Sequence, residues 1–198
     1  SVSQKIMVYD LGGGTFDVTI MRVADHAYDI LATDGNSRLG GIDFDKRLVG
    51  YIMQELEKQG VNMTNLSEKE KIQLQYKAEQ IKTSLSVNDQ ALYEHYVNGQ
   101  GYGVLITQAI FNEITLDLLK DTEIKVQSTL QASGLKWEEI DHILLVGGST
   151  RMPMIRQMIR LMSGLEPKFD LNPDTIVAQG ASILADLIVN NEVSFSEH

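Results

Sequence analysis

The sequence contains no cysteine, which excludes disulfides, thiolate metal sites and cysteine nucleophiles together. It also has no apolar run near the roughly 20 residues that span a bilayer. The first few residues lack the charged and apolar regions of a signal peptide. We therefore expect a cytoplasmic protein without a membrane partner.

The chain has fewer basic than acidic residues. The chain has 198 residues, with 17 Lys and Arg against 27 Asp and Glu, for a net charge of −10. This long-range field opposes nucleic acid, so we expect no nucleic-acid partner. The histidines show no spacing for a metal site or a catalytic triad; they are His26, His95, His142 and His198.

Two glycine-rich turns stand far apart in the chain, D-L-G-G-G-T-F-D at residues 10–17 and L-L-V-G-G-S-T-R at residues 144–151. Each follows a short apolar run that reads as a strand. Residues without a Cβ tolerate positive φ and leave room for several backbone N–H groups to approach a phosphate. Asp10 and Asp17 flank the first turn and can hold the Mg²⁺ that accompanies ATP, directly or through water.

Either glycine turn alone is more often only a tight turn. Their joint occurrence, with flanking carboxylates, favours a nucleotide site. A nucleotide that carries its own Mg²⁺ remains an acceptable ligand for an acidic chain.

Hydrophobic periodicity predicts both strands and helices. We expect strands over residues 6–10, 15–23, 28–33 and 143–146, with the first three forming an antiparallel edge, and a β-hairpin within residues 87–104. We expect helices over residues 44–58 and 68–85, a helix that follows residues 106–108 and ends near Gly134, one that begins near Pro153, and one from about residue 172 to 189. Ser149 and Thr150 are expected to cap the helix at Pro153.

Three polar residues of the predicted helix over residues 68–85 share one stripe. Glu79, Lys82 and Ser86 are spaced i, i+3 and i+7, to one side of an apolar stripe. Taken alone, Glu79 and Lys82 would more commonly be a solvated ion pair. The apolar stripe comprises Leu74, Ala78, Ile81 and Leu85.

Four segments together resemble one family. They are the two glycine turns, A-E-Q-I-K-T-S-L-S and L-N-P-D-T-I-V-A-Q-G-A. They look like the second lobe of the nucleotide-binding domain of DnaK-type heat shock protein 70 chaperones, within the superfamily of actin, hexokinase and chaperone ATPases. The resemblance covers essentially the whole chain. It implies an α/β fold, an actin-like (ribonuclease H-like) ATPase lobe in which residues 1–39 and 116–198 form one subdomain and residues 40–115 an inserted, smaller α+β subdomain.

The resemblance also implies roles for single residues. The phosphates would be held by Gly12, Gly13, Gly14 and Thr15, with Gly41 beside them, and Asp10 and Asp17 would organise Mg²⁺ and its water. The catalytic set would therefore be Asp10, Thr15 and Asp17. The ribose and adenine would be bound by Glu79, Lys82, Ser86, Gly148, Ser149, Arg151 and Asp174. The planar guanidinium of Arg151 suits stacking on the purine.

Three positions depart from the family pattern. Thr83 stands where many members place a longer side chain against the adenine, Gln108 replaces an arginine, and Ile42 interrupts an acidic G-G-x-D-F-D segment. None of these changes lies in the two glycine turns.

The chain starts with Ser and matches only one lobe, so we expect a piece excised from a longer protein, with Ser1 a cloning remnant. The expected partners are the missing first lobe and peptide-binding domain, a nucleotide-exchange factor and a J-domain co-chaperone. The parent would couple ATP hydrolysis to peptide binding. This lobe alone should bind ATP or ADP weakly with negligible turnover, because the transition state needs both lobes.

Two alternatives remain at this point. The chain could be a lobe of a sugar kinase or of an actin-like filament protein. It could also be a non-catalytic module that binds a co-chaperone or exchange factor through residues 44–104.

Overall fold

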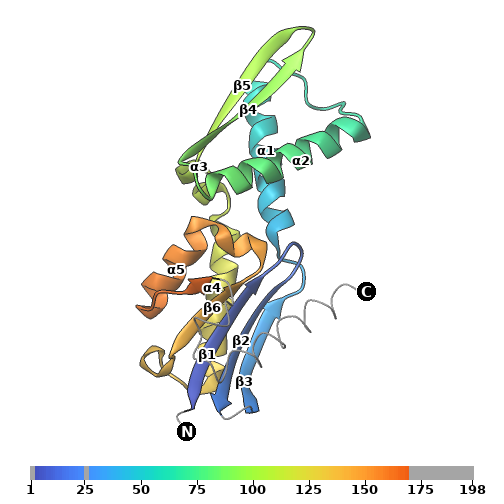
Figure 1. The fold of residues 1–198 in the computed structure, drawn as a ribbon. Helices are drawn as coiled ribbons and strands as arrows, with labels where there is room; N and C mark the ends of the chain where they lie inside the picture. Colours follow the sequence, from blue (N-terminus) through green and yellow to red (C-terminus); the bar gives the residue numbers. More distant parts are fainter. Residues whose placement is uncertain (1–2, 25–26, 170–198) are drawn as a thin grey trace.

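A computed structural model describes residues 3–24 and 27–169, and Figure 1 traces their path. A five-stranded mixed sheet has the strand order β3-β2-β1-β6-β7. Its strands are β1 (Gln4–Leu11), β2 (Phe16–Ala24), β3 (Ala27–Asn36), β6 (His142–Val146) and β7 (Lys168–Phe169). The three N-terminal strands are antiparallel, and β6 runs parallel to both β1 and β7.

Two helices accompany this sheet. They are α4 (Leu116–Ser133), which packs on β2 and β3, and α5 (Pro153–Ser163). The short 3₁₀ turns are η1 (Trp137–Glu139) and η2 (Gly148–Arg151). This arrangement confirms the expected α/β class.

The remaining elements form a second group, at the top of Figure 1. They are α1 (Gly41–Lys58), α2 (Glu68–Leu85), the hairpin of β4 (Gln90–Val97) and β5 (Gln100–Thr107), and α3 (Gln108–Ile114). The apolar stripe of α2, including Leu74 and Ile81, is buried as expected. One hydrophobic cluster runs from this group into the residues of β1 and β2 that face α4, such as Tyr9 and Phe16.

The helix expected to end near Gly134 is two helices. Thr107 caps α3 by accepting a hydrogen bond from the Ile110 N–H at 3.1 Å. Thr115 then leaves helical geometry, with φ −115° and ψ 6°, and its hydroxyl donates to the Phe111 carbonyl at 2.7 Å. A local side-chain bond to the preceding turn thus accompanies the break.

Ser149 and Thr150 do not cap α5, so this expectation is wrong. They lie in η2, and α5 starts after Met152 with Pro153 in its first turn. The Thr150 hydroxyl donates instead to the Gly147 carbonyl at 2.6 Å.

The helix expected from residue 172 lies outside the described residues. Among the helices described, none has the length and apolarity needed to cross a bilayer.

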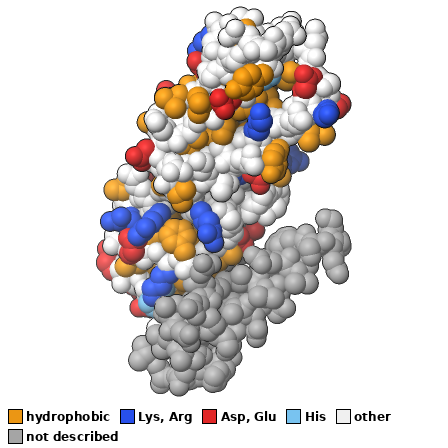
Figure 2. All heavy atoms as spheres, turned by 45° about the horizontal axis from the view of Figure 1, so that its top comes forward, with side chains coloured by type: hydrophobic (Ala, Val, Ile, Leu, Met, Phe, Trp, Pro, Cys, Tyr) orange, Lys and Arg blue, Asp and Glu red, His pale blue; other side chains and the backbone are white. Residues whose placement is uncertain are grey.

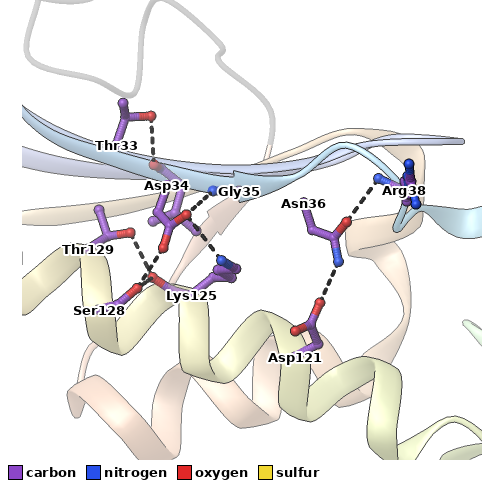
Figure 3. A network of polar contacts seen from close by, with 10 residues as sticks. Thr33, Asp34, Gly35, Asn36, Arg38, Asp121, Lys125, Ser128 and Thr129 are labelled. Atoms are coloured by element: carbon purple, nitrogen blue, oxygen red, sulfur yellow. Dashed lines mark hydrogen bonds and ion pairs between the residues drawn. The ribbon is translucent and has the colours of Figure 1, made fainter.

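A polar network joins β3 to α4 (Figure 3). The Asp34 carboxylate accepts hydrogen bonds from the Ser128 hydroxyl at 2.8 Å and the Gly35 N–H at 2.7 Å, and Lys125 Nζ lies 3.3 Å away. Together these donors hold the pKa of Asp34 below its ordinary value. The charged form of Asp34 therefore stabilises the contact between strand and helix.

We expect Asp34→Asn to lower the free energy of unfolding at neutral pH by about 1 kcal/mol, since the site is partly exposed. The native pKa lies below the unfolded one, so this stability is present above the unfolded pKa and is lost as the pH falls through the native pKa. Urea denaturation from neutral to acid pH should therefore show the two proteins converging. Asp29→Asn, at an exposed carboxylate of the same strand, is the control; an equal loss there would contradict the assignment.

Candidate functional site

Asp10 and Asp17 are cross-strand neighbours. They lie directly opposite each other in the β1–β2 ladder, a position that places side chains on the same face about 5 Å apart. Burial raises the pKa of the Asp17 carboxyl. No cluster of three or more metal-ligating side chains occurs among the described residues. Two adjacent carboxylates nevertheless fit a hydrated Mg²⁺, because this ion keeps several of its waters.

Gly35 lies next to Asp17 on the neighbouring strand, and no sequence pattern selected it as a site residue. It pairs with Asp17 in the β2–β3 ladder. A Cβ at this position would lie 2.6 Å from Asp17 Oδ1, closer than van der Waals contact allows. A Cβ there would also collide with the Phe16 carbonyl, so the close approach of β3 to β2 beside Asp17 depends on this glycine.

The first glycine turn is closed by a bond from the Gly12 N–H to the Thr15 carbonyl at 3.0 Å. Gly13 and Gly14 are exposed, and a Cβ on either would meet no atom of the described residues within 4 Å. Within the described residues, their N–H groups donate no hydrogen bond. Two backbone donors thus border open space, which is the arrangement that suits an anion.

The second glycine turn lies against the first. Gly147 has φ 92°, and a Cβ there would collide with the Leu11 carbonyl. Ser149, which is buried, donates from Oγ to the Gly12 carbonyl at 3.3 Å. Gly148 is exposed and borders open space. The parallel pairing of β1 with β6 therefore brings together two turns that are far apart in the sequence.

The start of α1 completes the junction. The Gly41 N–H donates to the Gly12 carbonyl at 2.8 Å, and the Ile42 N–H donates to the Gly13 carbonyl at 2.9 Å. A Cβ at Gly40 would collide with the backbone of Gly13 and Gly14, and one at Gly41 with Ser149 Oγ. The pair of glycines is thus required for α1 to approach both turns.

Lys82 reaches the same junction from α2. Its Nζ donates to the Gly41 carbonyl at 3.1 Å and forms an ion pair with Asp45 Oδ1 at 2.8 Å. Burial raises the pKa of the Asp45 carboxyl, while the Lys82 ammonium opposes that shift. The pair therefore ties α2 to the first turns of α1.

The other residues of the polar stripe lie to either side of Lys82 along the helix. Glu79 is exposed, and its carbonyl accepts a hydrogen bond from Thr83 Oγ1 at 3.0 Å. Ser86 is the C-cap of α2, and its hydroxyl lies 3.4 Å from the Lys82 carbonyl. Arg151 is exposed at the end of η2. Asp174 lies outside the described residues.

The site residues selected from the sequence include Gly41 but neither Gly40 nor Asp45. The doubled glycine before an amphipathic helix was a usable signal for Gly40. Asp45 follows Phe44 at a buried position of α1, and a carboxylate there indicates a buried partner.

Comparisons with known proteins place the chain in a family. The model of the family described as "Hsp70 protein" matches residues 1–195. The chain is 39% identical to proteins named "Chaperone protein DnaK" from Thermosipho melanesiensis and Thermosipho africanus. Each match covers 96% of this chain and 33% of the relative. The chain therefore spans about a third of the length of these curated relatives.

The buried ion pair yields a prediction about stability. Lys82→Met should lower the free energy of unfolding by about 3 kcal/mol at neutral pH, because it leaves Asp45 charged and unpaired. The loss should shrink at acid pH, since the raised native pKa lets Asp45 take up a proton before the unfolded chain does.

A double-mutant cycle with Asp45→Asn tests this pairing by chemical denaturation. The double variant should recover more than half of the loss, and Lys69→Met, at an exposed position of α2, should change little. Simple additivity of the two single changes would show that the residues are not coupled.

Proposed function

Because the chain belongs to the Hsp70 family, we propose that it is the second lobe of a DnaK-type nucleotide-binding domain and that it binds ATP or ADP with Mg²⁺. In this proposal the lobe has the actin-like, ribonuclease H-like fold. Residues 1–39 and 116–198 form the main subdomain, and residues 40–115 form the inserted one. The separate grouping of α1, α2, the hairpin and α3 in Figure 1 supports this division.

The convergence of the two glycine turns carries the proposal. The turn at Gly12 to Gly14 offers unused N–H groups to phosphate oxygens, beside carboxylates that fit Mg²⁺. Gly148 and Arg151 of the second turn and the polar stripe of α2 adjoin it and would serve the adenine and ribose. When bound, Mg²⁺ would neutralise charge on the phosphates, and Asp10, Thr15 and Asp17 would orient its water.

The parent protein would couple ATP hydrolysis to peptide binding. Family membership favours this chaperone role over the sugar-kinase and filament alternatives. The proposed partners are the first lobe and peptide-binding domain of the parent, a J-domain co-chaperone and a nucleotide-exchange factor.

We place the exchange-factor contact on the β4–β5 hairpin. Leu92, Tyr96 and Leu105 keep 59%, 67% and 50% of their surface exposed there. Figure 2 shows hydrophobic side chains among charged ones on this upper part of the surface.

The two parts of the site should respond differently to substitution. Arg151→Ala should weaken ADP and ATP alike by about 1–2 kcal/mol, through loss of a stacking and hydrogen-bonding partner. Asp10→Asn should reduce the Mg²⁺ dependence of binding and leave metal-free binding nearly unchanged. Calorimetric titration with ADP, with and without Mg²⁺, measures both effects.

Arg22→Ala, at an exposed arginine of β2, is the control for Arg151 and should bind as the unaltered chain does. Two results together would overturn the assignment of Arg151 to the adenosine and Asp10 to the metal. These are unchanged ADP affinity in Arg151→Ala and equal weakening of ADP binding by Asp10→Asn with and without Mg²⁺.

The chain should also show negligible ATP turnover. Phosphoryl transfer needs charge neutralisation from both sides of the γ-phosphate, and this chain supplies only one side of the proposed site. Steady-state phosphate release should stay at background in preparations free of other ATPases. Release well above background would refute the half-site account, whereas absence of nucleotide binding would favour the non-catalytic alternative.

A further inference from the structure

The carbonyl groups of Gly12 and Gly13 both point at the first turn of α1. They accept hydrogen bonds from the Gly41 and Ile42 N–H groups at 2.8 and 2.9 Å. The first N–H groups of a helix have no partner within the helix, so α1 has these donors available. The carbonyls of the turn and the first N–H groups of α1 thus supply each other's hydrogen-bond partners.

This contact fixes the direction of the neighbouring N–H groups. In a trans peptide the C=O and the following N–H point in opposite directions, and the described residues contain no cis peptide. With the Gly12 and Gly13 carbonyls turned toward α1, the N–H groups of Gly13 and Gly14 are turned away from it. Neither of these two N–H groups donates a hydrogen bond within the described residues.

Two further features hold the same orientation. Ser149 Oγ donates a second hydrogen bond to the Gly12 carbonyl at 3.3 Å. The peptide between Gly13 and Gly14 lies against Gly40, where a Cβ would collide with both its oxygen and its nitrogen. The turn is therefore held by α1, by Ser149 and by Gly40. None of these contacts is a hydrogen bond donated by the Gly13 or Gly14 N–H.

We propose that the first turn of α1 and the Ser149 hydroxyl set the phosphate affinity of the site by orienting the Gly12–Gly14 turn. The inference rests on the proposed nucleotide function and assigns Ser149 a new role. Ser149 and the Ile42 N–H act as positioning groups for the turn, and the phosphates are recognised by the N–H groups that they orient. Loss of either should weaken ADP and leave adenosine, which has no phosphate, unaffected.

A substitution at Ile42 breaks one of these contacts. Proline lacks an N–H but is tolerated in the first turn of a helix, and the preceding Gly41 has no Cβ to clash with the ring. Ile42→Pro removes the donor and places a ring carbon against the Gly13 carbonyl, so it breaks this contact and displaces the turn. Ile42→Ala removes the same side chain and keeps the donor.

Calorimetric titration of the 198-residue chain with MgADP and with adenosine provides the readout. Ser149→Ala should weaken MgADP binding by about three- to tenfold, the equivalent of one hydrogen bond, and Ile42→Pro should weaken it at least as much. Adenosine affinity should stay unchanged in both variants, and Ile42→Ala should match the unaltered chain with both ligands.

The possible outcomes distinguish failure of the proposed nucleotide function from failure of the positioning role. If the unaltered chain binds neither ligand, the proposed function fails and this inference fails with it. If it binds both and the two variants keep the ratio of ADP to adenosine affinity, the positioning role is wrong and the nucleotide function stands. An equal loss of ADP and adenosine in Ser149→Ala would make Ser149 a direct ligand of the adenosine and overturn its positioning role. Ser149→Ala decides the inference if Ile42→Pro does not fold.

Discussion

The hydrogen bonds to the Gly12 carbonyl join three segments that are far apart in the chain. The N–H of Gly41 and the hydroxyl of Ser149 both donate to this one oxygen. The close approach of these segments is possible because the positions around the oxygen, including Gly40 and Gly147, lack a Cβ. The glycines of this chain therefore serve two purposes, since some leave room for a ligand and others allow backbones to meet.

A buried ion pair also stabilises the junction of α1 and α2 with the glycine turns. Lys82 bonds to the carbonyl of Gly41 and pairs with the buried Asp45. A buried ion pair is seldom worth more than an apolar contact of the same volume, yet breaking it is costly. This pair therefore specifies how α2 meets α1, and it fixes the position of Lys82, a residue that also belongs to the proposed ribose and adenine site. Stability and function are coupled at this residue.

Periodicity in the sequence was sufficient to predict α1, α2, α5 and most strands, because alternation and helical stripes are local signals. It failed where a tertiary or local polar contact decides the outcome. Thr115 breaks an otherwise continuous helical pattern through its own hydroxyl, and Ser149 bonds to Gly12 and not to α5. The meeting of the two turns depends on the parallel register of β1 and β6, which no local pattern encodes. The joint occurrence of the two turns provided the expectation that they cooperate, and the family resemblance added Gly41 but not Gly40.

The central claim is that the backbone of the first glycine turn binds phosphate. The most direct measurement follows the amide resonances of Gly13 and Gly14 in the ¹⁵N-labelled chain, with Gly134 as a distant reference. Saturating MgADP should shift both resonances strongly, adenosine should leave them nearly unchanged, and Gly134 should not respond to either ligand. Unshifted Gly13 and Gly14 amides in the ADP-saturated protein would contradict the account.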